Sequence, residues 1–349
     1  MLYILLNEQI RTVYPISRTD SCHKTCYNIF CKTIVRKRGI VMIIQTGNRT
    51  DIPAFYPEWF ANRLREGYVL VRNPFNPVQV TKYRFDPSIV DLIVFCSKNP
   101  GPMLPYMNLL KPYKQYWFIT ITPYGRDIEP NVPEKELVID AFCSLSKIVG
   151  PERMCWRYDP ILVDQEWTVS RHIDAFSSMC EKLEGRTYTC VISFIDLYEK
   201  VWRNFPEART VPFDVQMHLT KALVKIAARH QMIIKPCGED PRLASAGADL
   251  SGCMTLKTFE AAVGQNLTLP PNPGNRKECS CYITNDIGQY NTCGHLCRYC
   301  YANADITTVK NNMLRHDPSS PLLVGRLRPE DKVHEAKQKS WIDPQLRLF

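Results

Sequence analysis

Short apolar segments that alternate with helix-like segments constrain the fold of this chain more than any other feature. From residue 42 onward, an apolar run of four to seven residues is repeatedly followed by a polar turn and an amphipathic segment. This alternation indicates parallel strands connected by crossover helices. The predicted strands are residues 42–45, 68–71, 91–96, 116–121, 153–156, 188–194 and 232–235, and the main predicted helices are residues 53–66, 133–148, 169–183 and 213–230.

Six or seven such units predict an α/β fold, in the form of a full or partial (β/α) barrel followed by a C-terminal cysteine-rich iron–sulfur segment. In such barrels the active site collects at the carboxyl ends of the strands. An open doubly wound sheet is the alternative, although no Gly-x-Gly-x-x-Gly fingerprint follows the first strand. We expect a barrel-like domain at residues 42–265, a linker and cysteine segment at 266–303, and an irregular tail at 304–349.

Residues 1–41 differ from the rest of the chain. They hold seven lysines and arginines but two acidic residues, and so contribute +5 of the net charge of +9. We interpret this segment as an extension, or as a misassigned start before Met42. The remaining 308 residues are only weakly basic, so nucleic acid is an unlikely partner.

The cysteine content indicates where the protein works. Fifteen cysteines occur without a secretion signal, which favours a reducing cytoplasm in which clustered cysteines bind metals. No apolar run approaches the roughly 20 residues of a membrane span, and we therefore expect no membrane partner.

The densest cysteine run is Cys293-Gly-His-Leu-Cys297-Arg-Tyr-Cys300, with C-x3-C-x2-C spacing and an aromatic residue before the third cysteine. Three thiolates this close can hold three irons of a 4Fe–4S cluster, which leaves the fourth iron free for a small molecule. The alternative is a zinc site on Cys297 and Cys300, which would also need Cys293 or His295 and a distant fourth ligand.

This run resembles the cluster loop of radical S-adenosylmethionine (SAM) enzymes. The resemblance implies a 4Fe–4S cluster on Cys293, Cys297 and Cys300, with SAM as the ligand of the fourth iron. Tyr299, Tyr301 and Asn303 are then candidates for cofactor binding, because an aromatic ring here can stack on adenine or shield the cluster. Ordinary packing is the alternative for both tyrosines. We expect His295 to be an exposed side chain or a hydrogen-bond donor near the cluster.

A second group of cysteines precedes this loop. Four thiols are the number needed for another 4Fe–4S cluster, and Cys237, Cys253, Cys279 and Cys281 are the candidates. The alternative is that Cys253 is a small buried residue and that Cys237 lies nearby without a role.

Charged residues follow several predicted strands. Arg49 and Asp51 come after the first strand, and Arg157 and Asp159 come after a later one. If the strands form a barrel, these four residues line one mouth and are candidates for catalysis, since arginine binds carboxylate or phosphate with two hydrogen bonds. The alternative is that they form salt bridges and helix caps at the rim.

Five segments resemble an uncharacterised bacterial and archaeal family, a domain of unknown function with a C-terminal cysteine cluster like the N-terminal one of radical SAM proteins. The segments are Arg49–Tyr56, Val71–Asn76, Trp156–Pro160, Asp286–Tyr290 and Cys293–Asn303. The resemblance implies a cytoplasmic iron–sulfur protein. In radical SAM enzymes the cysteine loop follows the first strand, whereas here it follows the barrel-like part, so the arrangement is either permuted or folded back over the mouth.

These observations favour a radical SAM-like enzyme with an unknown substrate and an electron donor such as ferredoxin or flavodoxin. A non-catalytic iron–sulfur or zinc-binding protein is the first alternative. A nucleic-acid repair lyase of the radical SAM type is the second, and the weak basic charge gives it little support.

Overall fold

The structure is a computed structural model and describes residues 42–268, 281–282 and 285–343. The extension predicted at residues 1–41 lies outside these ranges. So do residues 269–280 of the predicted linker and cysteine segment, which include Cys279. Within them, no helix has both the length and the apolar character needed to cross a bilayer.

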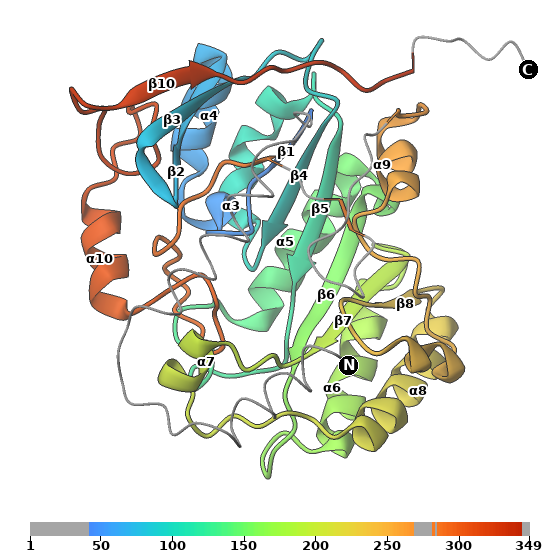
Figure 1. The fold of residues 1–349 in the computed structure, drawn as a ribbon. Coiled ribbons are helices and arrows are strands. Elements are labelled where there is room, and N and C mark those ends of the chain that lie inside the picture. The colour runs from blue at the N-terminus through green and yellow to red at the C-terminus, as the bar shows by residue number, and fades with distance from the viewer. Residues whose placement is uncertain (1–41, 269–280, 283–284, 344–349) are drawn as a thin grey trace, which may run out of the picture. The chain divides into compact units, whose positions relative to one another are not determined.

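Seven parallel strands form the main sheet (Figure 1). They are β1 (Ile43–Gln45), β4 (Leu92–Ser97), β5 (Gln115–Thr120), β6 (Met154–Ile161), β7 (Thr189–Phe194), β8 (Ile233–Pro236) and β9 (Asn285–Asp286), in the order β8-β7-β6-β5-β4-β1-β9. From β1 to β8 the order follows the chain without the reversal that defines a doubly wound sheet. The predicted α/β fold is therefore confirmed. Closure into a barrel is not confirmed, because no pairing joins β8 to β9 among the described residues.

Neighbouring residues of each strand pack into two different cores, as the alternation of side chains in a strand requires. On one face, Ile44, Phe95 and Trp117 pack against the crossover helices. On the other face, Ile43 and Val94 pack against a helix and the C-terminal part of the chain. Both faces of the sheet are buried, which explains why its strands read as continuous apolar runs.

The helices of the first face are close to those expected from the sequence. They are α3 (Ile52–Phe55), α4 (Pro57–Glu66), α5 (Lys135–Val149), α6 (Val169–Leu183) and α8 (Phe213–Arg229), with the 3-10 helix η2 (Gly101–Leu110). The second face is covered by α9 (Leu256–Val263), through Phe259, Ala262 and Val263.

The prediction for residues 68–71 was wrong in one respect. They belong to β2 (Tyr68–Asn73), which pairs antiparallel with β3 (Asn76–Arg84) and lies outside the main sheet. The side chain of Asn73 accepts hydrogen bonds from the backbone of Phe75 and Asn76 and so fixes a tight turn. Such a short connection permits only antiparallel pairing. β3 is mostly exposed and polar and contains no apolar run, so the search for apolar strands did not predict it.

The remaining elements are short. They are α7 (Glu199–Asn204), the 3-10 helices η3 (Pro151–Arg153) and η4 (Pro241–Ala246), and, in the tail, α10 (Ile306–Leu314) and β10 (Lys332–Glu335). β10 pairs parallel with β3, so part of the tail belongs to the three-stranded sheet β10-β3-β2.

Candidate functional site

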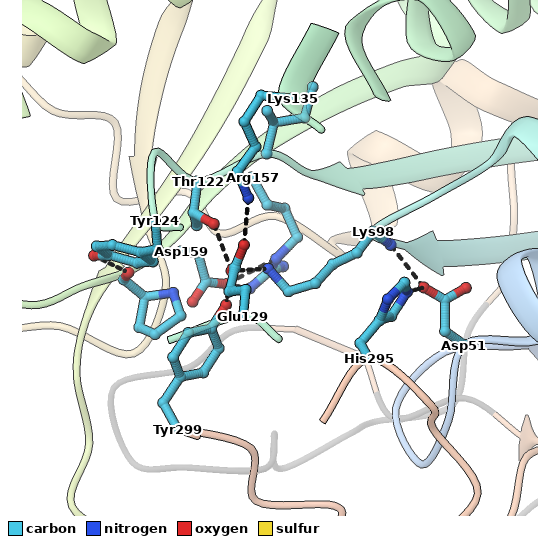
Figure 2. Close-up of polar contacts among 12 residues, drawn as sticks. Asp51, Lys98, Thr122, Tyr124, Glu129, Lys135, Arg157, Asp159, His295 and Tyr299 are labelled. Atoms are coloured by element: carbon cyan, nitrogen blue, oxygen red, sulfur yellow. Dashed lines mark hydrogen bonds and ion pairs between the residues drawn. The ribbon is translucent and has the colours of Figure 1, made fainter. Parts of the chain in front are cut away.

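The segments that follow β1, β4, β5 and β7 meet the late cysteine loop (residues 293–300) at the carboxyl ends of the strands. Asp51 is the first contact. One of its carboxylate oxygens accepts a hydrogen bond from the backbone of Ala54 and caps α3. The other accepts the backbone N–H of Lys98 at 2.7 Å and lies 2.9 Å from Nε2 of His295. Asp51 therefore joins two strand ends to the cysteine loop (Figure 2).

The loop between β5 and α5 holds the cysteine loop through its backbone. The side-chain amide of Asn131 donates to the carbonyl of Gly294 at 2.8 Å, and its backbone N–H donates to the carbonyl of His295. The N–H of Arg298 donates to the carbonyl of Ile128 at 3.0 Å. Because backbone groups make these contacts, the path of the loop is fixed independently of most of its side chains.

Glu129 lies at the centre of the polar residues in Figure 2. Its carboxylate binds Lys98 Nζ at 2.8 Å, Lys135 Nζ and the hydroxyl of Thr122, and it accepts a hydrogen bond from the hydroxyl of Tyr299. Burial alone would raise the pKa of Glu129, but the two ammonium groups outweigh it and lower that pKa to about 2. Glu129 is therefore an anion that fixes the residue preceding Cys300.

Of the three loop cysteines, Cys297 is buried, whereas Cys293 and Cys300 are half-buried. Burial, followed by the charges of the neighbouring cysteines, raises the pKa of the Cys293 thiol well above its usual range. The pKa of Cys300 is also raised by burial, and the N–H of Ala302 donates to its sulfur at 3.3 Å. Backbone N–H groups directed at sulfur are a common feature of iron–sulfur loops. Within the described ranges, however, no set of three or more His, Cys, Asp or Glu side chains is already arranged around a metal position.

The candidate cofactor-binding residues occupy different environments. Tyr299 is held by Glu129, and its ring lies 5.4 Å from the Lys98 ammonium. Tyr301 is half exposed and donates its hydroxyl to the carbonyl of Asn48 at 2.7 Å. Asn303 is buried and donates to the carbonyl of Cys293, while its Oδ1 atom has no hydrogen-bond partner among the described residues. Asn303 thus retains a free acceptor beside the cysteine loop.

Arg49 binds a residue that the sequence analysis did not single out as a site residue. Its Nε atom lies 3.1 Å from Oδ1 of Asp286, in β9. Asp286 also accepts the N–H groups of Asn48 and Gly288, each at 2.7 Å. Arg49 and Asp286 therefore attach the start of the cysteine segment to the end of β1. The available signal was that Asp286 opens one of the segments that carry the family resemblance.

Arg157 and Asp159 form a half-buried ion pair near the end of β6, with Nε and Oδ2 2.8 Å apart. Burial would raise the pKa of Asp159, but Arg157 and the hydroxyl of Ser193 reverse this effect and lower it. The other side of Arg157 approaches Cys253, with 4.0 Å between Nη1 and Sγ. The pair therefore lies next to the second group of cysteines.

The structure brings together the three described members of that second group. The sulfurs of Cys253 and Cys281 are 3.3 Å apart. A hydrogen bond from Cys253 lowers the pKa of Cys237, and Arg157 acts in the same direction. The fourth candidate, Cys279, lies outside the described residues.

The sequence analysis missed Glu129, Lys135 and Thr122 entirely. They lie in and beside the long connection between β5 and α5, where no spacing rule applies. His295 is 2% exposed and contacts Asp51, which agrees with a role as a hydrogen-bonding partner beside the loop.

A family model described as "Domain of unknown function (DUF1848)" matches residues 43–302. The chain belongs to this family. The matched segment contains both groups of cysteines and all seven strands of the main sheet. Asn303, α10 and β10 follow it. A search of curated proteins gave no match.

Proposed function

We propose that this DUF1848 protein is an iron–sulfur enzyme of the radical SAM type. The observation that carries the proposal is the position of the cysteine loop relative to the sheet. β9 forms one edge of the sheet, and the loop follows it after six residues. In the spatial order of the sheet, β9 is therefore a first strand followed by a cysteine loop. The strands β1, β4, β5, β6, β7 and β8 come next. This order supports a permuted form of the radical SAM layout, and with it a partial barrel.

The residues of the loop fit a 4Fe–4S cluster in their chemistry. Cys293, Cys297 and Cys300 would hold it, since three thiols are the protein ligands of a cluster that keeps one iron open. The backbone donor to the sulfur of Cys300 supports this assignment, because such hydrogen bonds tune cluster potentials. When bound, the cluster would supply one electron, received from a ferredoxin or flavodoxin, to cleave SAM into methionine and a 5′-deoxyadenosyl radical.

The protein's own residues would position the loop and bind the substrates. Asp51 and Glu129 hold the loop through His295 and Tyr299. Asn303, with its free buried acceptor, and the half-exposed ring of Tyr301 are suited to bind SAM. The Arg157–Asp159 pair, at the end of a central strand, is suited to bind polar groups of the substrate.

Anaerobic purification with iron and sulfide analysis, followed by electron paramagnetic resonance of the reduced protein, tests this proposal. We expect a 4Fe–4S signal that shifts when SAM is added. We also expect the Cys297→Ala variant to lose that signal and SAM cleavage, whereas Cys180→Ala, which changes a buried cysteine in α6, keeps both. Zinc in the loop, or a cluster that ignores SAM, would instead indicate a non-catalytic metal protein.

A further inference from the structure

Two cysteines from distant parts of the chain face each other on the second face of the main sheet. Cys253 precedes α9, and Cys281 precedes β9. Their sulfur atoms are 3.3 Å apart, and the two residues are 5% and 7% exposed. Both belong to the core that also contains Ile43 and Val94. The contact between the two sulfurs is therefore made by the fold and is shielded from bulk solvent.

Backbone hydrogen bonds hold the two segments in this position. The N–H of Tyr282 donates to the carbonyl of Met254 at 2.8 Å, and the N–H of Met254 donates to Cys281 Sγ at 3.4 Å. A disulfide bond is about 2.05 Å long, so the 3.3 Å separation must shorten by about 1.3 Å to form one. A side-chain movement of this size leaves the backbone pairing in place.

Other buried cysteines of the sheet are placed differently. The thiols of Cys155 and Cys190 point to the backbone carbonyls of the residues that follow them, at 3.5 and 3.8 Å. Such contacts are ordinary for a cysteine that fills space in a core. The pair that faces sulfur to sulfur has the arrangement that thiol–disulfide chemistry requires.

The two sulfurs also have different surroundings. Hydrogen bonds from neighbouring cysteines raise the pKa of the Cys253 thiol well above its usual range, so Cys253 keeps its proton. Cys281 instead accepts the peptide N–H of Met254, and such a donor favours a thiolate. Cys281 is therefore the nucleophile of the pair, and Cys253 is the thiol that reacts second.

We propose that Cys253 and Cys281 form a reversible redox pair that hydrogen peroxide oxidises to a disulfide. The Cys281 sulfur attacks one peroxide oxygen, the O–O bond breaks, and the thiol proton joins the leaving hydroxide as water. The Cys253 sulfur then attacks the resulting sulfenic acid, the S–S bond forms, and a second water leaves. The two thiols lose two electrons and two protons in all, and a dithiol reductant returns them.

The disulfide would act on the attachment of β9 to the sheet. It would join the segment before α9 to the segment that enters β9, where Asp286 binds Arg49. The N–H of Ile287 reports on this attachment, because it donates to the carbonyl of Gln45 at 2.9 Å. A cross-link beside β9 should restrict local opening, so we expect roughly tenfold slower hydrogen exchange of the Ile287 amide in the oxidised protein. The pair is thus a redox switch, and it does not depend on the proposed function.

The test treats the reduced, intact protein with hydrogen peroxide, blocks the remaining thiols and digests the chain with trypsin without reduction. The peptide of residues 243–257 holds Cys253 as its one cysteine. We expect mass spectrometry to find it joined to the peptide of residues 278–298, with fragmentation placing the link at Cys281. Dithiothreitol should release both peptides with unmodified thiols.

Three variants provide matched controls. Cys281→Ala should lose the cross-link, whereas Cys279→Ala, a change in the same peptide, should keep it. Cys155→Ala removes a thiol from the same core and should also keep it.

The wild-type measurement stands even if a variant fails to fold. The proposal is overturned if Cys253 remains a thiol after peroxide treatment, or if it becomes linked to Cys237 instead. Oxidation that dithiothreitol cannot reverse would also overturn it. Equal exchange rates of the Ile287 amide in the reduced and oxidised proteins would exclude the switch.

Discussion

The two groups of cysteines differ in how the chain brings them together. Cys293, Cys297 and Cys300 lie in one loop, whose shape is imposed by contacts with strand ends. Cys237, Cys253 and Cys281 come from three segments that only the folded sheet unites. The spacing within one loop singles out the first group, whereas the second group was suggested by the number of its thiols, and only the fold shows that its described members lie together.

Their surroundings differ as well. Near the loop, Lys98, Lys135 and Glu129 form a compact ionic group that holds Tyr299. Near the second group, Arg157 is the close charged neighbour of Cys253. Changes in one environment should therefore leave the other group intact, and the following predictions test how strongly the loop depends on its own.

The largest effect is expected for Glu129→Gln. The change leaves Lys98 and Lys135 without their buried counter-ion and should lower the free energy of unfolding by about 3 kcal/mol. Urea denaturation measures this, and Glu134→Gln, which breaks an exposed pair with Arg126, should cost less than about 1 kcal/mol. The variant should also lose the cluster proposed for the loop, whereas Glu134→Gln should keep it. Equal iron content in the two variants would contradict the role of Glu129 in holding the loop.

The pH dependence of Glu129 follows from its low pKa. Its folded-state pKa of about 2 lies below the usual value of 4.5, so its ion pairs stabilise the fold above pH 4.5. This contribution decreases as the pH falls from about 4.5 towards 2. Acid unfolding of the wild type should therefore be steeper over this range than that of Glu129→Gln.

A smaller effect is expected for Gly294→Ala. A Cβ atom there would lie 2.7 Å from the ring of Phe55, so the loop must shift. Because supporting residues of a metal site typically affect affinity 10- to 100-fold, we expect roughly tenfold weaker retention of loop iron, measured by chelator competition. Phe55→Leu in the same chain should restore part of the loss. If the double variant is no better than Gly294→Ala, the contact with Phe55 is not the cause.

The smallest effect is expected for Tyr301→Phe. It removes one hydrogen bond to the carbonyl of Asn48 from a half-exposed side chain, which should cost under about 1 kcal/mol of stability. The ring that would contact SAM remains, so SAM binding measured by calorimetry should change little, whereas Tyr301→Ala should weaken it clearly. Similar SAM affinity in both variants would remove Tyr301 from the cofactor site.

The sequence predicted the regular part of this fold well. Strands such as β4 and β7 and helices such as α6 were located closely because their side chains follow one period and their burial is uniform. The hairpin β2–β3 was not recognised, because an exposed polar strand owes its existence to its partner rather than to its own pattern.

The candidate site was predictable to a similar degree. Spacing identified Cys293, Cys297 and Cys300 in the loop, and chemistry pointed to Arg49 and Asp51. Their actual partners, Asp286 and His295, lie more than 230 residues away in sequence. Contacts over such separations depend on the order of strands in the sheet, which no local pattern specifies.

Because β9 pairs with β1, the last strand of the sheet must join the first after most of the chain has been synthesised. Arg49 and Asp286 are 237 residues apart, and closing a chain loop of that length costs roughly 5 kcal/mol of entropy. Asp51, Lys98 and Glu129 leave the ribosome long before His295 and Tyr299 can reach them. The sheet from β1 to β8 can form first as a template, and the cysteine loop is added last. The cluster proposed for this loop would therefore be acquired late, after most of the chain has been made.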